Sequence, residues 1–177
     1  MDREPNDLLL RASKVLLWCF MAIFMAGAAL ISLGLGTFLV WQTGLLGPIP
    51  DTAAGLNPAN APQLPLALLL ALAATLMAFR FAQLLAQIVG SIAKDDPFTL
   101  QNADRLRTMA LLALAYQAVS AGLFFLGVTV ARVAPIEALV SGEEFSLSSL
   151  LLALTLFILA RVFRYGAAMR ADLEGTV

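Results

Sequence analysis

Histidine is absent from this 177-residue chain, and cysteine occurs once, as Cys19. A single cysteine can form neither an internal disulfide nor a CxxC redox pair, which excludes disulfide-generating membrane enzymes. The missing histidine excludes histidine metal sites and histidine-dependent catalytic triads. We therefore identify no catalytic residue, no cofactor-binding residue and no metal ligand, and we expect a protein that is not an enzyme.

Charge is also scarce, at 13% of residues, whereas 60% of residues are hydrophobic and the mean hydropathy is +0.87. A membrane-spanning helix needs about 20 apolar residues. Three runs meet this length, and the fourth, apolar over residues 145–160, is short and must extend past two arginines to residue 165. The runs predict one transmembrane domain with spans at residues 15–41, 65–92, 106–133 and 145–165. The predicted fold is all-α: an integral membrane four-helix bundle made of two helical hairpins joined by a cytoplasmic loop. Gly27 and Gly34 share one face of the first span, which predicts a close helix contact there.

The positions of the cations predict the orientation. The two outer loops, residues 42–64 and 134–144, contain no Lys or Arg, whereas both terminal regions and the linker 93–105 contain them. Short loops rich in Lys and Arg remain on the cytoplasmic side. We therefore predict a multi-pass protein with both termini and the linker in the cytoplasm.

The most charged stretch between the two apolar halves is residues 95–107, here called the central segment. Pro97 ends any preceding helix, and Thr99 is a good N-cap. The side-chain oxygen of Asn102, three residues later, has the position needed for a weak capping box. The sequence thus predicts a new helix that starts near Leu100.

An intramembrane polar cluster is predicted around Arg80, because an arginine inside a span is costly unless it faces protein or water. Arg80, Gln83 and Gln87 recur at helical spacing, and no acid lies inside any predicted span. Candidate partners are Gln117, Ser120 and Tyr116, backbone carbonyls or a lipid phosphate. One interpretation is an anion or lipid-headgroup site, and the other is an interhelical hydrogen-bond cluster.

The central segment and the C-terminal tail, residues 165–177, also have two interpretations: a membrane-facing structural anchor, or a surface that binds a cytoplasmic partner. Within the segment, Asp104 and Arg107 are spaced to pair with each other. The tail is predicted to continue the last helix as far as Gly175 and to dock on the segment, with Asp172 facing Arg105. The candidate partner surface comprises Asp96, Pro97, Phe98, Asn102, Arg105, Arg107, Arg164, Arg170 and Asp172.

At these two segments the chain resembles a family of small bacterial four-span membrane proteins, domain-of-unknown-function family 2975. The resemblance rests on Pro97-Phe98 followed by Asn102 and Leu106-Arg107, and on residues 163–172 with Thr176-Val177. Asp96 stands where many relatives are expected to have glycine. The resemblance implies four helices, a bacterial cytoplasmic (inner) membrane location, and a small cytosolic helix-turn-helix regulator as partner.

Two functions from different classes remain open. The first is a non-enzymatic sensor or anchor whose cytoplasmic loop and tail engage a regulatory partner, with no direct nucleic-acid binding by this chain. The alternative is a small oligomeric transporter or channel subunit with an anion or headgroup site near Arg80. Proton-coupled carriers usually need a carboxylate inside a span, and all twelve acids lie outside the spans or at their ends. Besides the lipid bilayer, a homo-oligomeric partner is compatible with either function.

Overall fold

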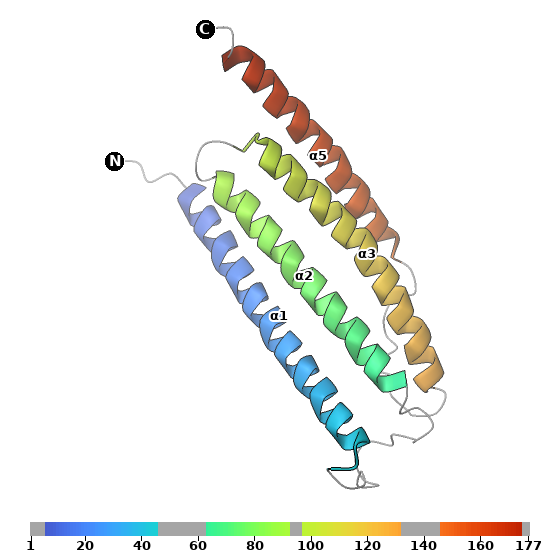
Figure 1. Cartoon of the computed structure of the whole chain (residues 1–177). Coiled ribbons are helices and arrows are strands. Elements are labelled where there is room, and N and C mark those ends of the chain that lie inside the picture. Colours follow the sequence, from blue (N-terminus) through green and yellow to red (C-terminus); the bar gives the residue numbers. More distant parts are fainter. Residues whose placement is uncertain (1–5, 46–62, 93–96, 132–145, 175–177) are drawn as a thin grey trace. The chain divides into compact units, whose positions relative to one another are not determined.

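The computed structural model contains four long helices within the residues it describes, which are 6–45, 63–92, 97–131 and 146–174. In chain order they are α1 (Asn6–Gln42), α2 (Leu64–Ile92), α3 (Leu100–Ala131) and α5 (Leu147–Glu174) (Figure 1). The described part of the chain has no strand. The all-α prediction is therefore confirmed.

Each helix contains a stretch that is long and apolar enough to cross a membrane: Arg11–Gln42, Leu64–Ser91, Leu100–Gly127 and Leu147–Leu173. At about 1.5 Å per residue, the shortest of these exceeds a hydrocarbon layer of roughly 30 Å. Many large apolar side chains point outward, and Trp18, Leu30, Phe125 and Leu147 are each 70% exposed. In water such a surface would aggregate, but in a bilayer it faces lipid tails. The fold is that of a multi-pass membrane protein.

The helices start and end where the local sequence requires. Pro65 lies in the first turn of α2, where its missing N–H removes no helical hydrogen bond. α3 starts at Leu100, directly after Thr99, which confirms the predicted start. α5 continues through Glu174, as the tail prediction requires. α3 begins six residues before the predicted span 106–133. Arg105, which was predicted to lie in the linker, is therefore a helical residue, as is Arg107.

Contacts divide the chain into two compact units. The first unit, called the polar-end unit, comprises residues 1–23, 78–115 and 147–177, and the second comprises residues 24–77 and 116–146. The polar-end unit has a continuous hydrophobic core from α2, α3 and α5, which contains Leu84, Ile88, Leu106, Met109, Ala110, Leu156 and Ala160. Around this core, α3 lies beside both α2 and α5 (Figure 1).

Small residues allow close packing in the polar-end unit. Ala103 and Ala110 on α3 are fully buried, and Ala153 and Ala160 on α5 are nearly so. Each pair is seven residues apart, so both members lie on one helix face. Helices in membranes associate through such small residues, because their backbones can then approach and make many van der Waals contacts.

The second unit shows that the glycine prediction for α1 is half right. A Cβ on Gly27 would be 3.9 Å from Thr75 Cγ2 of α2, which is ordinary van der Waals contact. A Cβ on Gly34 would meet nothing within 4 Å among the described residues. The tighter contact in this unit is at Gly122 of α3, where an added Cβ would lie 3.3 Å from Leu70 Cδ1. A seven-residue spacing puts two glycines on one face but does not say how far the neighbouring helix follows that face.

Candidate functional site: the polar end of α2, α3 and α5

Asn102 is the buried polar centre of the polar-end unit. Its side chain is fully buried, and its amide nitrogen donates to Ser91 Oγ at 2.7 Å and to the Pro97 carbonyl at 2.8 Å. Its side-chain oxygen accepts a hydrogen bond from Arg105 Nη1 at 2.7 Å. Ser91 in turn donates to the Ile88 carbonyl at 2.6 Å. This network joins the end of α2 to the start of α3, and every side-chain polar atom of Asn102 has a partner, as burial requires.

The N-cap prediction at Thr99 is confirmed, whereas the capping box is not. The backbone N–H of Asn102 donates to Thr99 Oγ1 at 3.2 Å. A capping box would also need the Asn102 oxygen to accept from the Thr99 N–H, but that N–H donates to the Pro97 carbonyl at 3.1 Å. Arg105 takes the Asn102 oxygen instead, and the charged donor makes this the stronger bond.

Phe98 connects the central segment to α5. Its ring centroid lies 5.0 Å from that of Phe163 at an interplanar angle of 43°. On the same helix, a Cβ added to Gly166 would fall 2.9 Å from Phe98 Cδ1. Only glycine leaves room for the ring at this position, so the aromatic contact depends on Gly166.

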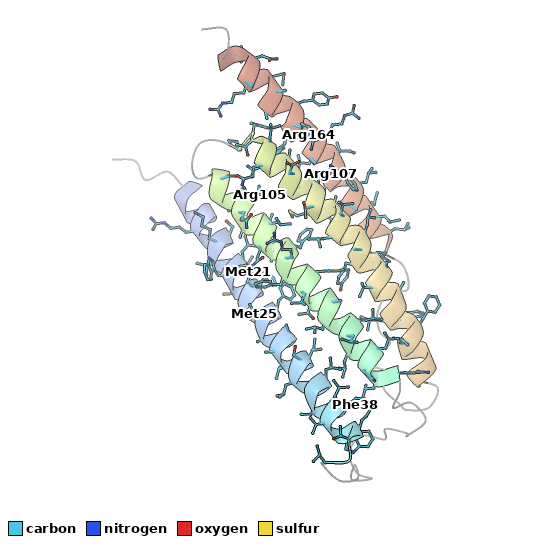
Figure 2. The ribbon with its side chains drawn as sticks, viewed as in Figure 1. Met21, Met25, Phe38, Arg105, Arg107 and Arg164 are labelled. Atoms are coloured by element: carbon cyan, nitrogen blue, oxygen red, sulfur yellow. The ribbon has the colours of Figure 1, made fainter. Side chains whose placement is uncertain are left out.

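An ion pair forms the second connection between the segment and α5. Arg164 Nη2 lies 2.9 Å from Asp104 Oδ1, with both side chains more than half exposed. One predicted pairing is therefore wrong, because Asp104 pairs with Arg164 and not with Arg107. Arg105 donates to Asn102, and its predicted pairing with Asp172 stays a prediction. Arg164 reaches Asp104 because α3 and α5 pack side by side through the core. Figure 2 marks Arg105, Arg107 and Arg164 near this end of the two helices.

Most residues of the predicted partner surface are exposed. Arg107, Arg164, Arg170 and Asp172 are exposed, and Phe98 is half exposed, whereas Asn102 is buried. Asp96 lies outside the described residues. Pro97 supplies its carbonyl to Asn102. The structure thus buries Asn102, packs one side of Phe98 against α5, and leaves Arg107, Arg164, Arg170 and Asp172 on the surface.

Among the described residues, only one pair of the predicted intramembrane cluster is hydrogen-bonded. Arg80 Nη1 donates to Gln83 Oε1 at 3.1 Å, so the polar stripe on α2 contains one hydrogen-bonded pair, while Gln87 is exposed. Gln117 and Ser120 belong to the second unit, where Gln117 is buried and Ser120 is partly buried.

Sequence reasoning missed three contributors. Ser91 was not among the predicted site residues. The one feature that distinguishes it from other serines in membrane helices is its position next to the last residue of α2. Tyr165 bonds Arg161 Nη2 through its hydroxyl at 3.2 Å, and Arg161 lies 5.5 Å from the tyrosine ring centre. The four-residue spacing of this pair on one helix is a usable signal. Phe157 lines a groove together with Arg161 and Tyr165. This groove exists because α3 packs against α5, so the sequence alone does not predict it.

Among the described residues, no group of three or more His, Cys, Asp or Glu side chains is arranged to hold a metal ion. Cys19 is an exposed free thiol on α1.

Four apolar helices with a polar, ion-paired end define this chain as a multi-pass α-helical membrane protein. Residues 49–177 match the family model described as "Protein of unknown function (DUF2975)", which covers most of the chain. The chain belongs to this family. The match includes α2, α3 and α5 and begins after α1. Searches of curated proteins and of solved structures found no match.

Proposed function

We propose that this chain is a non-enzymatic protein of the bacterial inner membrane, a sensor or anchor whose central segment and C-terminal tail bind a cytosolic regulatory partner. The observation that carries the proposal is the connection of the central segment to α5, by the Asp104–Arg164 ion pair directly before the tail and by the Phe98–Gly166 contact within the tail. Two stretches about 60 residues apart in sequence thereby form one surface. A change in the helices would alter both parts of that surface together.

The surface has the composition of a protein-binding patch. Gln101, Arg107, Arg170 and Asp172 are exposed, and so are the large apolar side chains of Tyr165, Met169 and Leu173. The last three recur every four residues and lie on one face of α5. Apolar contact area with a charged rim is typical of protein interfaces. The partner we propose is a helix-turn-helix regulator, which would supply the nucleic-acid contacts that this chain itself does not make.

The experiment is site-specific photo-crosslinking in native membranes. A photoreactive residue replaces Gln101 or Arg170, both of which are exposed. The matched control carries the same photoreactive residue at exposed Thr43, which directly follows the last residue of α1. We expect a protein adduct from Gln101 and Arg170 and none from Thr43, with mass spectrometry identifying a cytosolic regulator. Lipid adducts alone at Gln101 and Arg170 would contradict the proposal.

The alternative function, an oligomeric transporter or channel subunit, draws support from one observation. Arg80 is exposed within the candidate span Leu64–Ser91, and its hydrogen bond to Gln83 uses one of its five N–H donors. The remaining donors suit an anion. Anion flux into vesicles that contain the purified chain tests this function, and Arg80→Gln should abolish any flux while leaving the crosslinks unchanged.

A further inference from the structure

Three arginines line one groove of the polar-end unit. The groove has a volume of about 380 Å³, and its walls are Arg107 from α3 together with Phe157, Ala160, Arg161, Arg164 and Tyr165 from α5. Arg107 and Arg164 are labelled in Figure 2 near the start of α3 and on the C-terminal half of α5. Guanidinium groups repel one another, so their gathering in one groove favours an anionic occupant.

Protein contacts hold two of the three guanidinium groups in place. Arg164 is fixed by Asp104, and Arg161 is fixed by the Tyr165 hydroxyl and ring. Arg107 has no hydrogen bond or ion pair to any residue the structure describes. Asp104 offsets one of the three positive charges, which leaves an excess of about two. Arginine presents five N–H donors in a planar fork that matches the oxygens of a phosphate group.

When the outer edge of the hydrocarbon layer is set at the start of α5, the groove lies near the inner edge of that layer. Arg161 and Arg164 follow the first residue of α5, Leu147, by about 21 and 26 Å at 1.5 Å rise per residue. The hydrocarbon layer is about 30 Å thick, so both side chains reach its boundary. Phe157 lies one turn before Arg161, on the hydrocarbon side, and it gives the groove an apolar wall there.

We propose that this groove binds an anionic phospholipid, with Arg107 and Arg161 donating to the phosphate and an acyl chain lying along Phe157 and Ala160. Arg164, held by Asp104, supplies charge at the rim. Basic pockets between membrane helices bind anionic headgroups through the same combination of charge and apolar wall. The site is separate from Arg80, and it shares Arg107, Arg164 and Tyr165 with the partner surface proposed above.

The test uses the full chain in detergent, titrated with phosphatidylglycerol or phosphatidylcholine, with bound lipids counted by native mass spectrometry. We expect tighter binding of phosphatidylglycerol, and a loss of about tenfold or more in Arg107→Gln and in Arg161→Gln, since each removes a charge-assisted contact. Arg170→Gln is the matched control, because it removes the same charge from exposed α5 outside the groove. It should change the affinity less than twofold.

Three outcomes would overturn the proposal: equal affinity for the two lipids, an equal loss in Arg170→Gln, or displacement of the lipid by inorganic phosphate at the same concentration. The last would identify a soluble-anion site. Arg107→Gln removes no described hydrogen bond or ion pair, so its melting temperature should match that of the wild type. For Arg161, Arg161→Lys keeps the charge and should retain part of the lipid preference, whereas complete loss in this variant at an unchanged melting temperature would also contradict the proposal.

Discussion

Gly166 lies so close to Phe98 that a Cβ on the glycine would be 2.9 Å from Cδ1 and 3.4 Å from Cγ of the ring. These atoms belong to the rigid part of the ring, which also packs on Phe163. The ring therefore cannot move aside without losing that contact. Gly166 and Phe98 form one packing unit between the central segment and α5.

The first prediction concerns Gly166→Ala. Alanine favours a helix over glycine by about 0.8–1 kcal/mol, but overpacking costs about 1–3 kcal/mol. We expect a net loss of about 1 kcal/mol in unfolding free energy, measured in detergent. In a Phe98→Ala background the clash is absent, and the same substitution should stabilise the protein. Gly90→Ala on α2 is the control, because its added Cβ meets no described residue within 4 Å, and it should be neutral or stabilising. A destabilising Gly166→Ala in the Phe98→Ala background would contradict the role given to Phe98.

The second prediction concerns the buried amide. Asn102→Ala removes donors to Ser91 and Pro97 and the acceptor for Arg105. Leaving buried polar groups unpaired costs about 1–3 kcal/mol, and we expect a loss in that range from thermal or denaturant unfolding. Gln101→Ala, at the exposed neighbouring position, should change stability by less than about 0.5 kcal/mol. Equal effects at the two positions would show that the network does not stabilise the unit.

The third prediction is a charge exchange between Asp104 and Arg164. Exposed pairs of this kind contribute about 0.2–1 kcal/mol, so each single reversal, Asp104→Arg or Arg164→Asp, should lower stability slightly. The double variant should recover most of the loss, and the coupling should weaken at high salt. Arg170→Asp on the same helix is the control and should show no coupling to Asp104→Arg. Additive single effects would show that the pair is not formed in the membrane protein.

The fourth prediction concerns Gln117 of the second unit. Its side chain is buried, and it has no hydrogen bond to another residue that the structure describes. A buried amide without a partner costs about 1–3 kcal/mol, so Gln117→Leu should raise the melting temperature in detergent. A fall in melting temperature would show that Gln117 bonds a group outside the described residues.

The sequence predicted the helices well, because an apolar run of membrane length and a proline followed by an N-cap are local signals. Thr99 and the start of α3 are an example. The pairing of side chains was less predictable. Asp104 had a suitable partner three residues away in Arg107, yet it pairs with Arg164, because helix packing brings α5 beside α3.

The same reason explains the other differences. Asn102 was read as a surface residue and a capping acceptor, but its position between α2 and α3 buries it and directs its amide to Ser91. Tyr165 has its contact to Arg161 within α5, but Phe157 becomes part of a groove only because α3 and α5 pack together. Local spacing can identify such residues on one helix, but it cannot identify their partners on another.

We propose that the polar end formed by the central segment and α5 faces the cytoplasm. The chain has one cysteine, so Cys19→Ala gives a cysteine-free background for single cysteines at exposed Gln101 and Thr43. In intact cells, a membrane-impermeant maleimide should label Thr43→Cys and leave Gln101→Cys unlabelled until the membrane is opened. Labelling of Gln101→Cys from outside, with Thr43→Cys protected, would contradict the account.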